Sequence, residues 1–464
     1  MKVKNVIGGF IGDRDFYKRT LAIAIPVIIQ NTVTNLVNLL DNLMVGALGT
    51  EQMSGVAIVN LFVFVFNLAI FGAISGAGIF TAQFNGRGDV DGVRHTLRAK
   101  LIICSVVGII GVAIICGFGR PLISAFLHEG TEGDLALTLL SGESYLNYII
   151  IGLIPFALSQ VYASTLRETE ETVIPMIASV ISIATNFVFN GLLIFGLFGF
   201  PALGVVGAAI ATAISRFVEL IILVLYTHIN KKRFPFAVGL FRRFRIPAPL
   251  MKQILIKGAP ILANELFWAL SVTMCNQCYS TRGLDVVAAM NIAFTLENLL
   301  SVAYFALSSS IAIIVGNLLG AGELEKARDE DKKLLAFAAF VGLVMMGIQI
   351  SLSGIFPRLY ETTPEVRKLA GYIMRCYACA MPAAALATST YFTIRSGGRV
   401  YLTMLFDSVY AWSIVMPVAL ILAYLTAIPF KLFLPIVIVF ENLKLIPGLY
   451  FVYKGIWVRQ ITVE

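Results

Sequence analysis

The segment Gly86-Arg-Gly-Asp-Val-Asp-Gly-Val-Arg94 returns 234 residues later as Gly320-Ala-Gly-Glu-Leu-Glu-Lys-Ala-Arg328. The same offset aligns the two halves of the chain without a gap and pairs Pro26 with Pro260. Chance agreement between two apolar sequences would consist of Leu, Ile and Val, whereas these matches are prolines, glycines and charges, which fix backbone shape. The chain is therefore one unit written twice, and in a membrane such a repeat is typical of transporters.

Composition places this repeat in a membrane. Of the 464 residues, 58% are hydrophobic and 13% are charged, whereas a soluble protein has about 25% charged residues. Apolar stretches of about 20 residues or more recur along the whole length, and each is long enough to cross a bilayer as a helix. The sequence predicts an all-α membrane protein with twelve transmembrane helices in two six-helix bundles related by a parallel internal repeat. The expected spans lie near residues 20–46, 54–80, 96–118, 143–166, 172–197, 203–228, 253–279, 286–315, 334–356, 366–394, 400–426 and 430–453.

A basic segment without acids, residues 231–249, separates the two halves. We expect an N-terminal bundle over residues 1–230, a cytosolic linker over 231–249 and a C-terminal bundle over 250–464. Because each half has six spans, both copies point the same way across the membrane. Residues 1–19 lack the pattern of a signal peptide, so the first span is expected to be retained.

Basic residues are distributed unevenly over the predicted loops. With a cytosolic N-terminus, the inner segments hold most of the Lys and Arg, and the outer loops hold only Arg120, Arg282, Arg358, Arg367, Lys368 and Lys431. The positive-inside rule requires this asymmetry, so both termini are expected in the cytosol, with the chain in the cell (inner) membrane. Orientation and contact with anionic membrane lipid account for the net charge of +8, and no nucleic-acid partner is expected.

A polar stripe runs along the first span. Its amides are spaced by four, three and four residues, which places them on one face of a helix, and a hydroxyl and a carboxylate flank them. These residues are Asn31, Asn35, Asn38 and Asn42, with Thr34 and Asp41 beside them. Uncompensated polar groups in hydrocarbon are costly, so the stripe faces either a water-filled cavity or a polar seam between packed helices. The ionisable group favours a functional site.

Asp41 has the chemistry of an ion-exchange group. It lies about 20 residues into its span, or roughly 30 Å along the helix. Burial favours a protonated carboxyl, whereas a bound cation favours the carboxylate, so the group can exchange a proton for a cation. In the fifth span, Asn186 and Asn190 lie one turn apart on one face. Their oxygens suit Na⁺, although helix association alone also explains two asparagines.

Two carboxylates of the second half, Glu265 and Glu297, lie near mid-depth of the seventh and eighth spans. Such groups are expensive in a membrane unless solvated, protonated or paired, so they either attract a cationic substrate or act as structural hydrogen-bond donors. Trp268, one turn from Glu265, suits a cation–π wall. Asp407, near the inner end of the eleventh span, is expected to be an interfacial or helix-packing group.

Other features of the spans have simpler explanations. Arg216 and Glu219 are three residues apart in the sixth span, as in an internal salt bridge. The C-x-x-C pairs that begin at Cys275 and Cys376 are expected to be small buried apolar groups rather than ligands of a soft metal.

Prolines and glycines mark bends and close contacts. Pro26 and Pro260 occupy equivalent places inside the first and seventh spans, where each removes a helix hydrogen bond and permits a hinge. Hinges at matched positions suit an alternating-access machine. The pairs Gly72-x-x-x-Gly76 and Gly316-x-x-x-Gly320 predict close approach of neighbouring helices.

Three segments together resemble a known family. They are Leu39-Leu-Asp-Asn-Leu-Met-Val-Gly-Ala-Leu-Gly49, Ala82-Gln-Phe-Asn-Gly-Arg-Gly-Asp89, and the stretch from Asn186 to Ser215 that contains Gly196-Leu-Phe-Gly-Phe-Pro-Ala-Leu-Gly. The first segment resembles the first-span signature of the multidrug and toxic compound extrusion (MATE) family. The second resembles the signature that follows the second span of that family. The resemblance covers nearly the whole chain, including the twelve spans and the two halves.

The resemblance implies an exporter that needs no cofactor and is driven by inward flow of H⁺ or Na⁺. It implies two bundles around a central cavity and substrates that are organic cations or amphipathic drugs. The family's cation site in the N-terminal bundle matches Asp41, Asn186 and Asn190, with Asn190 at a place where some members carry a second aspartate. Glu265 is the nearest match to the seventh-span glutamate that binds cations in other members. The repeat equivalent of Asp41 is Cys275, so coupling at Asp41 should dominate.

Competing functions are disfavoured by residues the chain lacks. A flippase for lipid-linked sugars, from the same superfamily, should concentrate cations in its cavity to hold pyrophosphate, whereas the spans contain only Arg216, Arg375 and Lys444 well inside. An intramembrane enzyme is disfavoured because the three histidines are isolated and no H-E-x-x-H or G-x-S-x-G motif is present. A channel would show no exchange stimulation in counterflow. The chain is expected to act as a monomer, with no catalytic residue and no metal site.

Overall fold

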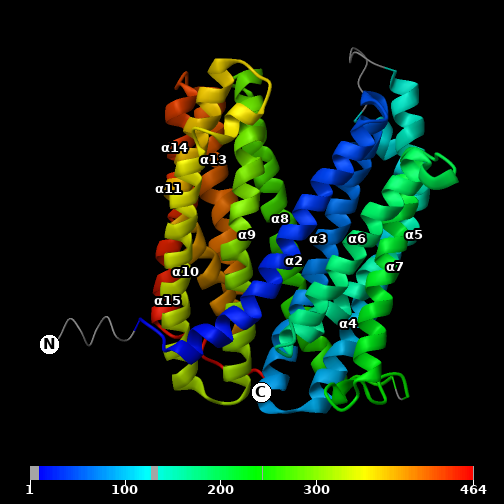
Figure 1. The fold of residues 1–464 in the computed structure, drawn as a ribbon. Coiled ribbons are helices and arrows are strands. Elements are labelled where there is room, and N and C mark those ends of the chain that lie inside the picture. Colours follow the sequence, from blue (N-terminus) through cyan, green and yellow to red (C-terminus); the bar gives the residue numbers. More distant parts are fainter. Residues whose placement is uncertain (1–9, 127–133, 243, 463–464) are drawn as a thin grey trace. The chain divides into compact units, whose positions relative to one another are not determined.

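The computed structural model describes residues 10–126, 134–242 and 244–462, apart from the side chains of residues 37–39 within the first helix. Over these residues the fold is entirely helical, and twelve helices are long and apolar enough to cross a membrane. Each overlaps one expected span, so the all-α class and the span count are confirmed. The helices (Figure 1) are longer than the apolar stretches, because polar residues continue their first and last turns.

Six spanning helices precede the basic segment. They are α2 (Arg14–Gly46), α3 (Thr50–Arg87), α4 (Val90–Ser124), α5 (Leu135–Glu168), α6 (Val173–Phe195) and α7 (Val205–Ile229). A short 3₁₀ turn, η1 (Leu197–Gly199), lies between α6 and α7, and a second, η2 (Pro235–Ala237), follows α7.

The second half repeats this order. It begins with α8 (Ala248–Ser280), α9 (Leu284–Gly320), α10 (Leu324–Leu352), the 3₁₀ turn η3 (Phe356–Leu359) and α11 (Pro364–Ser396). The eleventh span contains α12 (Val400–Met404), η4 (Leu405–Val409), η5 (Ala411–Val415), α13 (Met416–Leu420) and η6 (Ile421–Leu425), of which the η segments are π-helical. The twelfth contains α14 (Phe430–Asn442) and α15 (Leu445–Tyr453).

The chain forms two compact units that are not contiguous halves. Unit 1 consists of Met1–Ile28, Ala82–Gly88 and Ala263–Glu464, and unit 2 of Ile29–Thr81 and Asp89–Leu262. The division therefore differs from the expected halves in three places: the first turns of α2 and the end of α3, Ala82–Gly88, lie in unit 1, and the first turns of α8 lie in unit 2. Helices α2 and α8 change unit two residues after a proline, Pro26 or Pro260, and these two change points are separated by the repeat offset.

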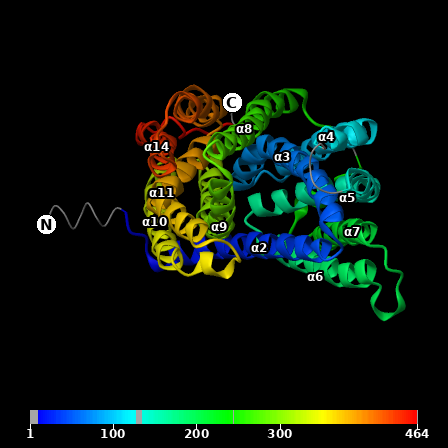
Figure 2. The same ribbon diagram turned by 90° about the horizontal axis from the view of Figure 1, so that it is seen from above.

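In unit 1, the first turns of α2 are held by apolar contacts. Phe16 and Ile23 belong to a buried cluster with Leu318 of α9 and Ile394 of α11. Ala24 packs with α9 and α10 in a smaller cluster. Helices α9, α10 and α11 lie side by side behind these contacts (Figure 2). Burial of this apolar face fixes the first part of α2 within unit 1.

Equivalent residues of the two repeats form a close crossing of α3 and α9 inside unit 1. A Cβ atom on Gly86 would lie 1.9 Å from the carbonyl oxygen of Asn317, and one on Gly320 would lie 1.9 Å from that of Gln83. These two contacts are related by the 234-residue offset. The side chains of Asn85 and Asn317 join the crossing with a hydrogen bond of 2.7 Å. Glycine is needed twice because the ends of α3 and α9 approach with their backbones in contact.

In unit 2, glycines serve the same purpose between α3 and the first turns of α8. A Cβ atom on Gly72 would lie 2.8 Å from Leu262 Cα, and one on Gly76 would lie 2.3 Å from Gly258 Cα. The close approach predicted from the first glycine pair is thus confirmed. Helix α7 packs along both α5 and α6 in this unit, which brings polar residues of α6 and α7 together.

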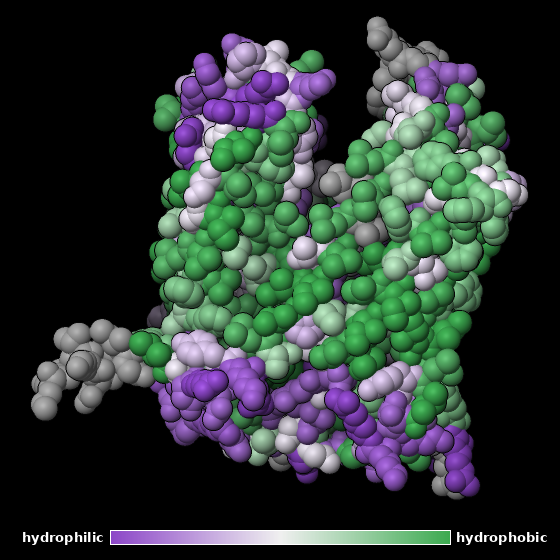
Figure 3. Space-filling model, in the orientation of Figure 1, coloured by the Kyte–Doolittle hydropathy of each residue, from purple (hydrophilic) through white to green (hydrophobic). Residues whose placement is uncertain are grey.

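Glycines and caps explain the repeated segment itself. Gly88 and Gly322 both adopt positive φ, 75° and 79°, which non-glycine residues rarely do. In the first copy, Asp89 Oδ1 then accepts a hydrogen bond of 2.8 Å from the backbone N–H of Gly92 and caps α4. Local backbone conformation and capping therefore explain why the helix ends after the second span of each half. On each unit, hydrophobic side chains cover the middle of the helices and hydrophilic ones gather at the ends (Figure 3).

Candidate ion-coupling site and inner polar networks

Asp41 of α2 is bound by two amides of α6 in unit 2. The side-chain nitrogen of Asn190 donates to Asp41 Oδ1 at 2.5 Å. The Asn186 amide is assigned, from its hydrogen-bond partners, with its nitrogen 2.9 Å from the same oxygen and its oxygen accepting from Thr212 Oγ1 at 3.1 Å. Asp41, Asn186 and Asn190, which were predicted to act together, are therefore in contact. Thr212 of α7 completes the group.

Local structure explains why the two amides meet the carboxylate. Asn186 and Asn190 lie one turn apart on α6, and both are buried, with 4% and 1% of their surface exposed. Asn190 Oδ1 is buried and accepts no hydrogen bond from any described residue. A buried amide oxygen without a donor is costly, so this oxygen provides an open acceptor for a cation or a water molecule beside Asp41.

Charged and phenolic groups surround this cluster. Arg216 lies one turn after Thr212 on α7, and its Nη1 is 3.5 Å from Glu219 Oε2, as the predicted internal salt bridge requires. It interacts electrostatically with Asp41. Tyr145 of α5 interacts electrostatically with Asp41 and Arg216. Its hydroxyl donates to Asn60 Oδ1 at 3.5 Å. Asp41 is thus not isolated from positive charge.

The rest of the predicted stripe is more exposed. Thr34 Oγ1 donates to the carbonyl of Gln30, one turn earlier in the same helix, at 2.8 Å. Asn35 and Asn42 are exposed, and Asn31 is half-buried. Asn38 belongs to the stripe by sequence, but its side chain lies outside the described residues.

Sequence reasoning missed a buried polar chain below Asp41. Gln30 Nε2 donates to Ser179 Oγ at 2.7 Å, and Ser179 donates to Glu219 Oε1 at 2.7 Å. Arg167 of α5 reaches Gln30 Oε1 at 3.5 Å. Gln30 stands one turn before Thr34, so the polar face of α2 begins earlier than the asparagines indicated. The four-residue spacing of Gln30 and Thr34 was therefore the feature of the sequence that could have indicated this polar chain.

In unit 1, Glu265 of α8 has partners on α11. The hydroxyl of Tyr391 donates to Glu265 Oε1 at 3.4 Å, and Arg395 Nη1 lies 4.0 Å away. Arg395 also stacks over the rings of Tyr391 and Phe392. Both contacts to Glu265 are long, so this carboxylate, whose side chain is 15% exposed, is held loosely.

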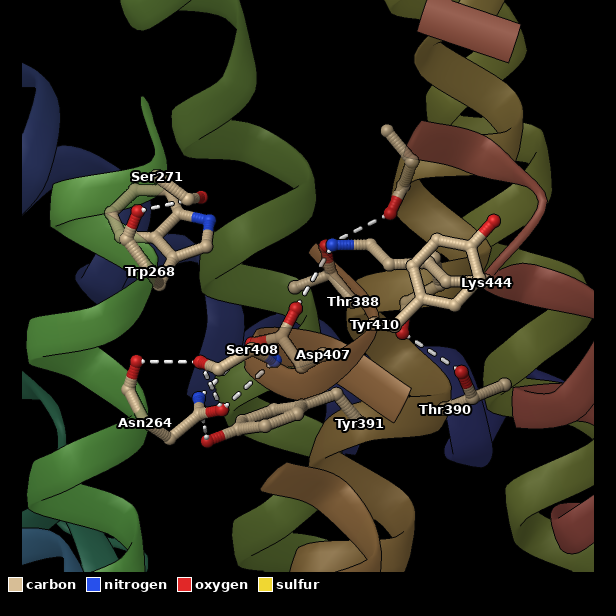
Figure 4. A network of polar contacts seen from close by, with 12 residues as sticks. Asn264, Trp268, Ser271, Thr388, Thr390, Tyr391, Asp407, Ser408, Tyr410 and Lys444 are labelled. Atoms are coloured by element: carbon tan, nitrogen blue, oxygen red, sulfur yellow. Dashed lines mark hydrogen bonds and ion pairs between the residues drawn. The ribbon is translucent and has the colours of Figure 1, made fainter. Parts of the chain in front are cut away.

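Asp407 forms an ion pair that joins spans, which agrees with the helix-packing alternative expected from the sequence. Lys444 Nζ contacts Asp407 Oδ1 at 2.9 Å, and Asn264 Nδ2 donates to Oδ2 at 3.0 Å. Ser408 donates to Asn264 Oδ1 at 2.6 Å (Figure 4). Asp407 and Ser408 lie in the π-helical segment η4, and such segments are frequent at functional sites. Sequence spacing gave no sign of this pair, because its members belong to different spans.

Glu297 and Trp268 have separate surroundings. Gln349 of α10 is fully buried and donates to Glu297 Oε2 at 2.9 Å and to the carbonyl of Met374 at 3.0 Å. The backbone carbonyl of Trp268 accepts from Ser271 at 3.1 Å, and the residue is half-buried (Figure 4). The described cysteines are free, and Cys275 and Cys376 pack against one apolar cluster. No group of three or more metal-binding side chains forms within the described part of the chain.

Twelve spanning helices, an internal repeat and buried ionisable groups define a multi-pass membrane protein of the transporter class. The sequence profile of the MatE family matches residues 26–192 and residues 260–425, that is, once in each half. The second match begins 234 residues after the first. The chain belongs to the MatE family. Its membership confirms the resemblance seen in the sequence and the prediction that the protein is not an enzyme.

Curated relatives cover most of the chain. It is 25% identical over 415 residues to a probable multidrug resistance protein NorM of Thermotoga maritima, covering 87% of this chain and 85% of the relative. It is 27% identical over 414 residues to a protein of the same description in Halalkalibacterium halodurans, with coverage of 88% and 87%.

Solved structures share the fold. A MATE in the bent conformation superimposes with a TM-score of 0.85 at 19% identity, over 95% of each chain. An outward-facing multidrug resistance MATE transporter gives 0.83 at 18% identity, over 97% of this chain and 98% of the other. These likenesses confirm the architecture.

Proposed function

We propose that this protein is a secondary active antiporter that exports organic cations or amphipathic drugs in exchange for H⁺ or Na⁺ by alternating access. The observation that carries the proposal is the contact of Asp41 with Asn186 and Asn190 inside unit 2. An ionisable group held within a membrane bundle by polar partners is a functional candidate by default. Relatives named as multidrug resistance proteins support the substrate class.

Ion exchange at Asp41 follows from its surroundings. Its carboxylate accepts two amide N–H groups, and the open oxygen of Asn190 lies in the same cluster. A cation or proton neutralises the carboxylate, whereas its loss leaves a charge that only these amides and nearby basic groups stabilise. The two states differ in charge by one, and alternating access requires two such states.

Pro26 and Pro260 are the proposed hinges. The helices that contain them change unit two residues later, and proline leaves a helix carbonyl without its usual partner. The 1–230 and 250–464 halves are the proposed repeat units, joined by the cytosolic linker 231–249. Both termini are proposed to lie in the cytosol and the chain in the inner membrane as a monomer.

Substrate contact is proposed for Glu265, Glu297 and Trp268, together with Thr34, Asn38 and Asn42 of α2. Glu265 is the best candidate because its contacts to Tyr391 and Arg395 are long. A loosely held carboxylate can attract an organic cation without first breaking a strong ion pair. Glu297, in contrast, is tied to a buried amide.

The flippase alternative has weaker support. Arg216 and Lys444, two of the inner cations that could hold a pyrophosphate, are paired with Glu219 and Asp407. Paired cations offer less charge to a phosphate than free ones.

The decisive experiment is drug efflux from proteoliposomes under separately imposed pH and Na⁺ gradients. The antiporter predicts uphill efflux driven by at least one gradient and abolished by Asp41→Asn. An efflux rate of the native protein that depends on neither gradient would contradict the proposal. Transport of lipid-linked sugars without drug efflux would favour the flippase.

A further inference from the structure

The linker between the two repeats, residues 231–249, is folded against unit 2, where it packs on α4 near the end of α7 (Figure 1). We propose that its exposed side chains form a docking surface for the headgroups of anionic phospholipids in the cytosolic leaflet. This surface, the linker face, consists of Lys231, Lys232, Phe241, Arg242, Phe244 and Arg245. The inference adds a membrane partner to the proposed function and rests on the cytosolic position proposed there for the linker.

Two arginines of α4 hold the backbone of the linker. Arg98 donates from Nε to the carbonyl of Leu240 and from Nη2 to that of Gly239, both at 2.8 Å. Its Nη1 donates to the carbonyl of Arg245 at 3.1 Å. Arg94, one turn earlier on α4, donates to two further linker carbonyls, each at 3.1 Å. The linker face is therefore carried by a fixed backbone rather than by a free tether.

Two aromatic rings of the linker face are exposed. Phe241 and Phe244 have 63% and 43% of their surface exposed, and their rings stack with centroids 6.4 Å apart. Arg98 lies over Phe244 at 5.9 Å, and Phe241 stacks on His228 in the last turn of α7 at 5.9 Å. A spanning helix ends in that turn, so the rings lie where hydrocarbon gives way to water. Exposed aromatic rings beside basic residues are typical of segments that bind this interface.

The surface of α7 leads to the same place. Ile221, Leu225 and Ile229 recur at four-residue steps, and 51%, 54% and 73% of their surfaces are exposed. Residues at this spacing share one helix face, and an exposed apolar row on a spanning helix suits contact with hydrocarbon. His228, which carries Phe241, directly precedes Ile229. The apolar row of α7 therefore continues into the linker face.

The basic side chains of the linker face form no ion pair with any described residue. They are exposed, and residues 231–249 contain no Asp or Glu. The neighbouring Arg233, in contrast, pairs with Glu171 of unit 2. Near an anionic membrane surface, one basic side chain is worth about a five-fold gain in affinity. Charge complementarity thus favours an anionic partner for this surface.

The combination of charge and aromatic rings favours a phospholipid over other anions. A soluble phosphate would bind the basic groups but leave Phe241 and Phe244 in water. A phospholipid supplies a phosphate for the basic groups and an apolar boundary for the rings. An acidic protein segment would need to displace the linker face from the membrane surface, and the test below distinguishes this case.

The test uses the full-length, purified protein in phosphatidylcholine vesicles, with Phe241→Trp as a fluorescent reporter. Brominated phosphatidylglycerol and brominated phosphatidylcholine are the probes, because bromine quenches a tryptophan that it contacts. The native protein, with its three tryptophans, provides the background to subtract. We expect half-maximal quenching of the added tryptophan at a mole fraction of phosphatidylglycerol about five-fold lower than that of phosphatidylcholine. Equal mole fractions would overturn the inference.

A charge variant shows whether the preference belongs to the linker face. Lys231→Gln, Lys232→Gln and Arg242→Gln, combined in the reporter protein, should abolish the preference for phosphatidylglycerol. Because these side chains are exposed and unpaired among the described residues, the thermal unfolding temperature should not change. A preference that survives in this variant would contradict a docking site at the linker face.

A matched control removes the same charge elsewhere. Lys326, Arg328 and Lys332 at the start of α10 are exposed, and each pairs with an acid three residues earlier at 2.8, 2.9 and 3.2 Å. Replacing these three residues with Gln should leave the preference at the reporter intact. Loss of the preference in this control would show that net charge, rather than the linker face, attracts the lipid, and would overturn the inference.

Competition separates the lipid from other partners. Inorganic phosphate and sodium chloride of equal ionic strength should weaken the preference equally, because both act by screening. A loss in phosphate alone would reveal a site for soluble phosphate, and an added tryptophan that neither lipid quenches would place the linker face in water; each result would refute lipid docking. These readouts do not involve transport. Failure of the lipid test therefore leaves the antiport proposal intact, whereas undiminished efflux in Asp41→Asn would refute the antiport and not the lipid site.

Discussion

The side-chain nitrogen of Asn190 lies 2.5 Å from Asp41 Oδ1, although the two residues are 149 positions apart in the chain. Within unit 2 this contact joins a half-buried carboxylate on α2 to a buried amide on α6. A change of charge on Asp41 must alter the contact, because an N–H donor binds an anion more strongly than a neutral acid. The contact therefore links the charge on Asp41 to the arrangement of α2 and α6.

Asp41→Asn should abolish ion-coupled efflux and leave the protein folded, because the amide keeps the shape of the carboxylate but cannot carry its charge. The measurement is drug efflux from proteoliposomes, with thermal unfolding as a check on folding. Asp134→Asn is a matched control, since Asp134 caps α5 at an exposed site and asparagine caps equally well. Native efflux rates in Asp41→Asn would remove this residue from the mechanism.

Asn190→Ala should strengthen binding of the ion that neutralises Asp41. The substitution removes an N–H donor that stabilises the ion-free carboxylate, and this hydrogen bond to a charged group is worth about 2 kcal/mol, or roughly a 30-fold gain of affinity. The measurement is the concentration of driving ion that gives half-maximal efflux. Asn291→Ala changes an exposed amide of α9 and should leave this concentration unchanged. An unaltered value in Asn190→Ala would show that the contact has no part in coupling.

Glu265→Gln should reduce the affinity for cationic substrates more than that for neutral ones. The change removes a charge that is loosely held by Tyr391 and Arg395 and so available to a ligand. Equilibrium binding of one cationic and one neutral drug of similar size provides the comparison, with the exposed Glu361→Gln as control. Equal losses for both drugs would assign Glu265 a structural role.

Lys444→Met should destabilise the protein, because it strands Asp407 without its ion-pair partner at 2.9 Å. The side chains of this pair are 20% and 15% exposed, so breaking it should cost less than the about 3–5 kcal/mol of a fully buried pair, whereas replacing both members is far less harmful. We expect Asp407→Asn/Lys444→Met to recover most of the lost thermal stability. Intrinsic fluorescence suits the measurement, because all three tryptophans, Trp268, Trp412 and Trp457, belong to unit 1. A double variant no more stable than Lys444→Met would argue against a simple pair.

The bend of α2 at Pro26 should depend on the bound ion. Spin labels at Lys18 and Leu43, both exposed and on opposite sides of the proline, should report different distances at low and high pH. A pair at Ile29 and Leu43, wholly beyond the proline, serves as control and should not change. Identical distances for the first pair at both pH values, with and without Na⁺, would count against a hinge.

Much of the fold could be read from residue type and spacing. Twelve apolar stretches of sufficient length predicted twelve helices, because a membrane requires every backbone polar group to be satisfied within a helix. The 234-residue offset predicted the repeat, since glycines such as Gly88 and Gly322 recur only where backbone geometry recurs. The exchange of the first turns of α2 and α8 between units was not predictable, because sequence continuity does not reveal which helices share an apolar face.

The membrane class, the duplication and the place of Asp41 on a polar helix face follow from the amino-acid sequence, because they depend on composition and local periodicity. The partners became known from the packed helices: Asn190 for Asp41, Lys444 for Asp407, and the Gln30, Ser179 and Glu219 chain. Each of these contacts joins different spans. Helical periodicity fixes the face on which a residue lies but not the rotation or depth of the neighbouring helix, so contacts across helices are set by how the bundle packs.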